Sequence, residues 1–458
     1  MSRLVEGSLV LGAIFAVLAF GGTEPVSFTI VEFLFLGLGV LLVVRPGSLP
    51  TGFSLRAFVV PALLLGAVLL QLCPFPAIWS RRIAGGGDPL PGSRLTFLSI
   101  DPHSTRTHLF VLLTCLIAFF LARIVSQDRQ RKWRLIVSLV ALGIFEAFYG
   151  LTQYLSGWQK IFTYTKQFDL EEATGTYINR NHYAGFLEMI LPFSLALALY
   201  EYNKLRGDGR KQPAGLKKLV TRSTSQRLVL WLSIAVVLYA ALIFSRSRMG
   251  IVAASASLLL IFGLMAAYRY HQRTGLLFAF AFFALSIGLA FWIGPGPVVT
   301  RFQAVGQEYT LGDQSRLSIW RDALGLIRHH PWFGTGFGTF PITFTAVQTT
   351  FLGQLVNHAH NDYLEFSSDL GLPAALILFA SVAFILSRAV RAFLSMAGDF
   401  ERFVTLGCVG SIVAILLHSM TDFNLYIPAN TLLFSSILGL ASVTQQRNEK
   451  LGRRILAT

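Results

Sequence analysis

Charged residues are scarce in this sequence. Asp, Glu, Lys and Arg make up 13% of its 458 residues, whereas a soluble globular protein carries roughly 25%. Cysteine is scarcer still, and Cys73, Cys115 and Cys408 form neither a metal-ligand spacing nor a disulfide framework. Aromatic residues, in contrast, are plentiful enough to exclude a disordered chain. With 54% hydrophobic residues and a mean hydropathy of +0.60, the composition excludes a soluble cytosolic enzyme and predicts a polytopic membrane protein.

Twelve stretches are apolar and long enough, or nearly so, to cross a membrane, for which about 20 residues are needed. They lie at about 6–22, 27–45, 57–73, 107–125, 134–155, 183–200, 228–245, 249–267, 275–293, 371–388, 402–420 and 427–444. Pro61 and Pro192 are expected to break the third and the sixth. The first stretch follows a single Arg3 and lacks a small-residue cleavage site, so we interpret it as a retained helix rather than a signal peptide. The predicted fold class is an all-α polytopic membrane protein with about 12 transmembrane helices.

Basic residues exceed acidic ones by 38 to 23, which gives a net charge of +15. Such an excess is also typical of nucleic-acid-binding proteins, but the apolar content favours membrane topology, and we expect no nucleic-acid partner. Lys and Arg gather on the cytoplasmic side of membrane proteins. The densest basic cluster, at 201–227, obeys this rule when both termini are cytoplasmic. We therefore predict a multi-pass chain with cytoplasmic N- and C-termini.

The segment 294–370 is then a large outer loop, far longer than an ordinary helix connection, and long ordered loops usually carry function. Within 315–328 the apolar side chains recur at spacings of three and four residues: Leu317, Trp320, Leu324 and Ile327. This spacing predicts an amphipathic helix, which we expect to lie along the outer membrane–water interface.

The richest polar segment of the sequence is 357–365, just before a predicted span. If it is helical, His358, Asp362 and Glu365 share a face with Asp369, and His360 lies on another. Polar groups at the entrance of a membrane helix are costly and tend to be functional. The alternative is a polar helix cap, for which Asn361 is suitable. A His-x-His metal site through His358, His360 and Asp362 is conceivable, but no separate ligand set accompanies it, and we expect no metal.

Two arginines, Arg246 and Arg248, lie at the outer ends of two spans, against the positive-inside trend. A guanidinium group is suited to bidentate binding of phosphate, and the alternative is contact with lipid headgroups. Arg316 in the large outer loop is a third outer arginine. The run from Gly334 to Gly338 has neither a preceding strand nor a following lysine, so it predicts a tight loop rather than a dinucleotide site.

Two further polar groups lie at outer span ends. Asn179, Asn181 and His182 open the sixth span and either contact sugar hydroxyls or, for the asparagines, cap the helix. Asp422 lies in the outer turn before the last span, where it either orients an outer arginine or caps the turn. The sequence leaves both choices open.

Four motifs in this order resemble the O-antigen ligase and polymerase superfamily of bacterial membrane glycosyltransferases. They are Ser247-Arg248-x-Gly250, Arg316-x-x-x-Trp320, His330-Pro331-x-x-Gly334-x-Gly336, and His360-Asn361 followed by Gly371. The resemblance covers roughly residues 170–440, and residues 1–150 resemble the family only in hydropathy. It divides the chain into N-terminal helices (1–170), a ligase/polymerase-like region (171–444) and a cytoplasmic tail (445–458). Ala374, where ligases often have a glycine, and the paired Arg246 depart from the pattern.

The resemblance implies a metal-independent, inverting glycosyltransferase that needs no cofactor and has a fold related to the type C glycosyltransferases. It implies work at the periplasmic face of the bacterial inner membrane on a glycan attached to undecaprenyl diphosphate. Arg248 and Arg316 would bind the diphosphate, and His360 would act near the acceptor. The acceptor is lipid A–core for a ligase, a lipid-linked repeat unit of the nascent polysaccharide for a polymerase, or a protein. A chain-length regulator is a further candidate partner.

The chemistry agrees with these roles. A departing diphosphate gains negative charge that fixed arginines stabilise, and the attacking hydroxyl loses a proton that a neutral histidine accepts. The sequence does not choose between His360, Glu365 and Asp362 as the base. The alternative function is a transporter or flippase of polysaccharide intermediates. Transporters keep their polar groups near the bilayer midplane, whereas only Glu188 is expected there in this chain, and this placement favours an enzyme.

Overall fold

The computed structural model describes residues 2–44, 56–76, 95–208, 223–268, 284, 288, 312–349, 355–396 and 399–455. The N-terminal half contains α1 (Ser2–Leu18), η1 (Phe20–Gly22), α2 (Pro25–Val44), α3 (Arg56–Gln71), β1 (Phe75–Pro76), β2 (Leu95–Thr96), α5 (Pro102–Val125), α6 (Arg129–Ser156), β3 (Lys160–Ile161), β4 (Tyr164–Thr165), α7 (Arg180–Asp208) and α9 (Ser223–Phe244). The remainder contains α10 (Arg248–Tyr268), α14 (Gly312–His329), α15 (Phe340–Thr343), η3 (Phe344–Ala346), α16 (Asp362–Leu370), α17 (Leu372–Ser395), α18 (Asp399–His418), η4 (Asn424–Tyr426) and α19 (Pro428–Ile455). The strands form two short antiparallel pairs, β1–β2 and β3–β4.

The chain is an all-α membrane protein. Among the described residues, eight helices are long and apolar enough to cross a membrane. They coincide with the second, fourth to eighth, tenth and eleventh of the predicted stretches. The first, third and last stretches coincide with α1, α3 and α19. The ninth, at 275–293, lies outside the described residues except for positions 284 and 288.

The expectation that two prolines break their spans is wrong. Both α3 and α7 run continuously through Pro61 and Pro192. The reason is clearest at Pro192, where α7 packs against the glycine surface of α18, and a Cβ on Gly410 would come within 2.8 Å of the proline Cβ. Neighbouring membrane helices stabilise a proline-containing helix that would break in isolation.

Helix α7 is the centre of the bundle. Its membrane-crossing part is entirely buried, and it packs against α9, α18, α10 and α6. Small residues allow these helices to approach closely: a Cβ on Gly143 of α6 would meet Ile190 at 2.7 Å, and one on Gly407 of α18 would meet Phe193 at 2.7 Å. The close packing fixes the two ends of α7 and α18 relative to each other.

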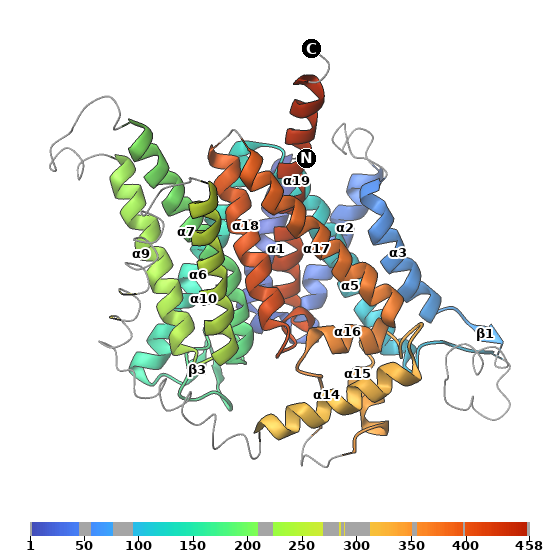
Figure 1. Cartoon of the computed structure of the whole chain (residues 1–458). Coiled ribbons are helices and arrows are strands. Elements are labelled where there is room, and N and C mark those ends of the chain that lie inside the picture. Colours follow the sequence, from blue (N-terminus) through green and yellow to red (C-terminus); the bar gives the residue numbers. More distant parts are fainter. Residues whose placement is uncertain are drawn as a thin grey trace.

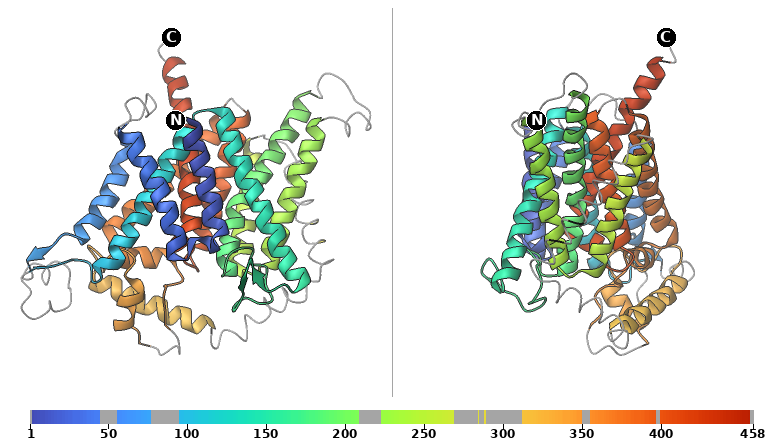
Figure 2. Two further views of the ribbon diagram at one scale, coloured as in Figure 1. Left: turned by 180° about the vertical axis from the view of Figure 1, so that it is seen from behind. Right: turned by 60° about the vertical axis from the view of Figure 1, so that its left-hand side comes forward.

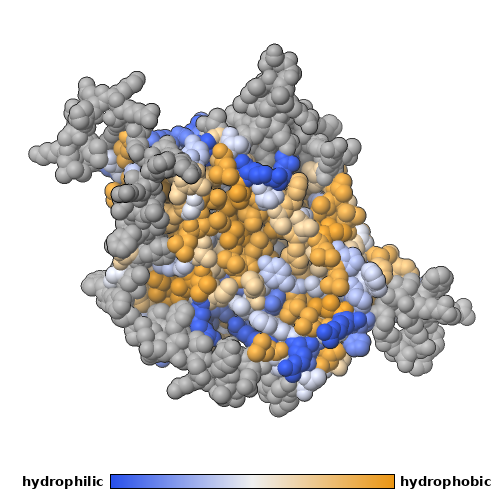
Figure 3. Space-filling view, in the orientation of Figure 1, coloured by the Kyte–Doolittle hydropathy of each residue, from blue (hydrophilic) through white to orange (hydrophobic). Residues whose placement is uncertain are grey.

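The spans form a bundle with one elaborate end (Figures 1 and 2). Helices α14, α15 and α16 lie there, and α14 crosses the axes of the spans. The beginning of α1 and the end of α19 both lie at the opposite end. On the face shown in Figure 3, apolar residues cover the middle of the bundle and hydrophilic residues gather toward both ends. This distribution is the one that a bilayer requires.

The amphipathic helix predicted at 315–328 is present as α14, but its predicted apolar face is only partly correct. Leu317 and Leu324 are exposed. The side that packs inward carries Ile319, Ala323 and Leu326, which form a small core with Phe340, Phe344, Val356 and Ala359. Of the other two predicted residues, Ile327 is buried and Trp320 packs against this core. The inward side is displaced from the predicted stripe, because the segment after α14 packs on a side that periodicity alone does not reveal.

Candidate functional site

The polar segment before α16 meets the turn between α18 and α19. The backbone N–H of Asp362 donates to the carbonyl oxygens of Ser419 (3.0 Å) and Asp422 (3.2 Å). The Asp362 carboxylate accepts from the backbone N–H of Leu425 at 3.1 Å. The hydroxyl of Tyr363 donates to the Leu416 carbonyl in α18. These contacts hold the two segments together, although about sixty residues separate them in the sequence.

The predicted helical face of this segment is wrong for its two histidines, because α16 begins only at Asp362. Asn361 is the N-cap, and its Oδ1 accepts from the Leu364 N–H at 3.1 Å. The same side chain donates to the Met420 carbonyl. The structure therefore gives Asn361 the capping role that the sequence offered as one of two alternatives, and it leaves His358 and His360 in the loop before the helix.

His360 is paired with Asp422. Its Nδ1 lies 3.3 Å from Oδ1 of Asp422, and a third of the histidine side chain is exposed, whereas the aspartate is buried. Burial by itself would raise the pKa of Asp422, but the hydrogen bond from His360 and the charges of neighbouring histidines lower it below the usual range. An ionised Asp422 accepts the Nδ1 proton, so the second nitrogen, Nε2, carries a lone pair. The partner of Asp422 is a histidine, where the sequence suggested an arginine or a cap.

His358 is paired with Glu365, one turn into α16. Its Nδ1 lies 2.6 Å from Oε1 of Glu365, and Oε2 accepts from the Ala359 N–H at 2.8 Å. Burial raises the pKa of Glu365 to about 8, although the Ala359 bond and the charge of His360 oppose the shift. Burial lowers the pKa of His358 to about 4, against the opposing effect of Asp422. At neutral pH the pair therefore holds one proton between Oε1 and Nδ1.

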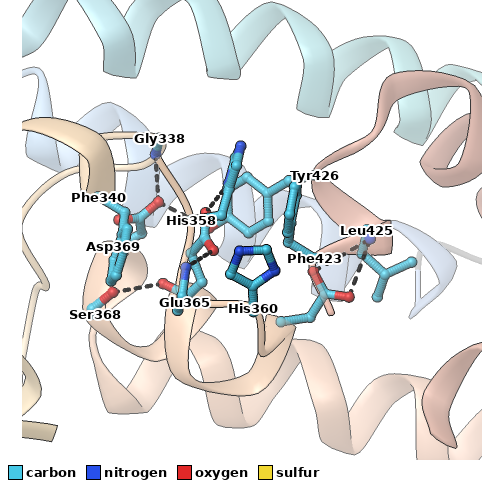
Figure 4. A network of polar contacts seen from close by, with 12 residues as sticks. Gly338, Phe340, His358, His360, Glu365, Ser368, Asp369, Phe423, Leu425 and Tyr426 are labelled. Carbon is cyan, nitrogen blue, oxygen red and sulfur yellow. Dashed lines mark hydrogen bonds and ion pairs between the residues drawn. The ribbon is translucent and has the colours of Figure 1, made fainter. Parts of the chain in front are cut away.

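Phe423 separates the two histidine–carboxylate pairs (Figure 4). Its ring stacks face to face on His358, with centroids 3.9 Å apart, and meets the edge of His360 at 5.0 Å. A third histidine, His182, also packs against this ring, at 4.7 Å. The site thus consists of three imidazoles around one phenyl ring, with a carboxylate behind each of two of them.

The glycine run predicted as a tight loop lies buried under this site. The backbone N–H of Gly338 donates to Oδ2 of Asp369 at 2.7 Å, and Tyr426 donates to the same oxygen at 2.8 Å. Gly334, Gly336 and Gly338 all have positive φ, a conformation that favours glycine. A Cβ on Gly338 would lie 2.0 Å from His108. N–H groups of the loop donate to residues of α16 and to Gln71, so the loop supports α16.

Arg246 is occupied by acidic side chains. It forms ion pairs with Glu171 at 3.1 Å and Glu172 at 3.6 Å, and only a tenth of its side chain is exposed. Arg248 is the first residue of α10 and Arg316 lies in the first turns of α14. Both are partly exposed. Its acidic partners therefore make Arg246 less suited to bind an added anion.

The asparagines that open α7 have a local role. Oδ1 of Asn179 accepts from the Asn181 N–H at 2.7 Å, which is a cap contact and agrees with that alternative. His182 is buried, and its carbonyl oxygen accepts from Asn430 of α19 at 3.0 Å. Glu188, deeper in α7, pairs with His418 of α18 at 3.0 Å.

Sequence reasoning missed several residues that build the site. Phe423 and Tyr426 were not selected, because an aromatic residue in a hydrophobic chain carries no signal of its own. The sequence also does not predict Gln71, at the end of α3, as a residue of the site. Its Nε2 donates to the Asp369 carbonyl at 2.8 Å, and its Oε1 accepts from Phe337. The one signal in the sequence that could have indicated Gln71 is its position as a polar side chain at the end of an apolar stretch.

No set of three or more His, Cys, Asp or Glu side chains within the described ranges has the geometry of a metal site. The fold and the site together define a polytopic, all-α membrane protein with paired histidines and carboxylates at one end of its bundle. Residues 228–379 match the family model described as O-antigen ligase. The match confirms the resemblance to the O-antigen ligase and polymerase superfamily and supports a glycan-transferring ligase or polymerase. No curated protein matches the sequence.

Proposed function

We propose that this protein transfers a glycan from undecaprenyl diphosphate to an acceptor hydroxyl, with inversion at the anomeric carbon, at the periplasmic face of the inner membrane. The observation that carries the proposal is the pairing of His360 with Asp422 at 3.3 Å. Burial of the carboxylate and partial exposure of the imidazole are the arrangement that orients a general base toward a substrate. The match of residues 228–379 to the O-antigen ligase family supplies the class of reaction.

In the proposed step, Nε2 of His360 takes the proton of the acceptor hydroxyl as its oxygen attacks the anomeric carbon. The bond from that carbon to the phosphate oxygen breaks, and undecaprenyl diphosphate leaves with the electron pair. Asp422 stabilises the imidazolium that forms. Glu365 and Asp362 are less suited to act as the base, because both are fully buried and burial raises the pKa of each, so that each carboxyl group keeps its proton at neutral pH.

The departing diphosphate needs positive charge, and we assign this role to Arg248 and Arg316. Removal of one donor that stabilises developing negative charge costs about 3–4 kcal/mol in other enzymes. Arg246 is the weaker candidate, since Glu171 and Glu172 already neutralise it. Asn179, Asn181 and His182 are proposed to line the glycan path on α7, and lipid A–core or a lipid-linked repeat unit is the acceptor.

A deletion strain that expresses wild type, His360→Ala or His329→Ala tests this function. His329 is an exposed histidine at the end of α14 and serves as the matched control. We expect His329→Ala to restore the glycan and His360→Ala to insert in the membrane without restoring it. Long polymer trapped on undecaprenyl diphosphate would identify a ligase, and single repeat units would identify a polymerase. Full restoration by His360→Ala would contradict the proposed base and favour a transporter.

A further inference from the structure

The two histidine–carboxylate pairs flank one ring but differ in their hydrogen bonds. Oδ1 of Asp422 accepts from the Phe423 N–H at 3.0 Å and also faces His360, so this carboxylate only accepts. Glu365 has its Oε2 occupied by the Ala359 N–H, and its Oε1 lies 2.6 Å from His358. A separation this short between a carboxyl oxygen and an imidazole nitrogen requires one proton between them.

The surroundings of Glu365 favour the protonated form of that pair. Glu365 is fully buried, as are the nearby carboxyl groups of Asp362 and Asp369. No Lys or Arg pairs with Glu365 within the described ranges of the chain. A buried carboxyl group without a neighbouring cation retains its proton. In some enzymes a buried carboxylic acid stays protonated in this way and donates a hydrogen bond.

The position of this proton determines what His358 offers to a substrate. With the proton held between Glu365 and Nδ1, the other nitrogen of His358 is an N–H donor. His360 has the opposite arrangement, with its proton on Nδ1 toward Asp422 and a lone pair on Nε2. A quarter of the His358 side chain and a third of the His360 side chain are exposed. The structure therefore presents one donor and one acceptor side by side on Phe423.

We propose that His358 binds the acceptor sugar by donating its Nε2–H to a hydroxyl next to the one that His360 deprotonates. The inference rests on the proposed function and names the acceptor's chemistry: a sugar that carries two adjacent hydroxyl groups. A neutral donor suits a hydroxyl oxygen, whereas the diphosphate calls for arginine. Glu365 is then a positioning residue that fixes the tautomer of His358.

Glu365→Gln is the sharpest test, because glutamine reproduces the two hydrogen bonds of a protonated carboxyl group. Its amide N–H donates to Nδ1 of His358 and its oxygen accepts from Ala359. The full chain in nanodiscs is given lipid-linked repeat units and lipid A–core extracted from the deletion strain. We expect Glu365→Gln to keep the acceptor KM within about threefold of wild type. Glu365→Ala and His358→Ala should raise it about tenfold with a smaller change in kcat, as loss of one hydrogen bond predicts.

Glu365→Gln as impaired as Glu365→Ala would overturn the inference, because a required negative charge would then explain both. A second measurement needs no activity: ¹⁵N NMR of histidine-labelled full-length protein should find His358 protonated on Nε2 and His360 on Nδ1. The reverse tautomer of His358 would also overturn it. If His360→Ala is inactive while His358→Ala is fully active, this inference is rejected and the proposed function is retained. If His360→Ala is active, the proposed function itself is rejected.

Discussion

His360 has a backbone φ of +48°, a conformation that is uncommon for residues other than glycine. Such strain persists where the surrounding contacts are strong enough to hold it, and it clusters at functional sites. The contacts are present on both sides of His360: Trp320 donates to the Ala359 carbonyl at 3.0 Å, and Asn361 caps α16. The loop is therefore rigid where the proposed base lies.

Asp422→Asn tests the orientation of the base. The amide keeps the shape of the carboxylate but not its charge, so it neither fixes the Nδ1 proton nor stabilises the imidazolium. We expect transfer to slow by about 100-fold or more, while the amount of inserted protein stays near that of wild type. Rates of glycan transfer by the purified variant are the measurement. An unchanged rate would show that Asp422 serves only the turn.

Glu365 makes the stability of the protein depend on pH. Its pKa is raised from 4.5 to about 8 in the folded chain, so the folded state holds a proton that the unfolded state releases. The contribution is complete below about pH 4.5 and is lost as the pH rises toward 8. We expect Glu365→Gln, which cannot ionise, to gain unfolding temperature relative to wild type between pH 5 and pH 8. A difference that stays constant across this range would contradict the raised pKa.

At the scale of elements, the loop between α6 and α7 is tied to the turn before α10. Arg180 pairs with Glu172 at 2.6 Å, and Arg246 pairs with Glu171 and Glu172. Glu172 thus lies between two arginines from different elements, and Glu171 pairs with Arg246. This network gives Arg246 two acidic partners, which the sequence alone does not reveal.

Arg246→Ala and Arg248→Ala are expected to differ for this reason. Loss of Arg246 leaves the largely buried Glu172 with one partner fewer, and we expect a cost of about 1–2 kcal/mol in stability with transfer reduced only in proportion to folded protein. Loss of Arg248 should abolish transfer by the protein that remains folded. Parallel measurement of transfer and thermal unfolding distinguishes them. If Arg246→Ala abolishes transfer and Arg248→Ala does not, Arg246 is the arginine that binds the diphosphate.

Hydropathy predicted the eight long apolar helices found among the described residues, because burial in lipid demands long apolar runs whatever the tertiary contacts are. It failed at Pro61 and Pro192, where packing overrides local preference. The polar cluster at 357–365 was found from composition alone, but its partners were not: Asp422 and Phe423 reach the histidines through a turn about sixty residues away. A single sequence holds no record of that contact.

At the scale of the whole molecule, the site lies at the end of the bundle opposite the two termini (Figure 1). Cys73 follows α3 at the site end and is exposed, whereas Cys115 and Cys408 are buried. A membrane-impermeant maleimide should therefore label Cys73 in cells whose inner membrane is intact, and Cys73→Ser should abolish the labelling. Labelling that appears only after the inner membrane is lysed would place the site, and the proposed reaction, on the cytoplasmic side.

We propose that this chain itself transfers the glycan, with His360 as the base and without a metal ion. The most direct test is the purified full-length protein in nanodiscs with lipid-linked repeat units and extracted acceptor, in the presence of EDTA. The account predicts transfer by wild type and by His329→Ala, and a rate at least about 100-fold lower for His360→Ala. Transfer by His360→Ala at the wild-type rate, or activity that EDTA abolishes and a divalent cation restores, would contradict it.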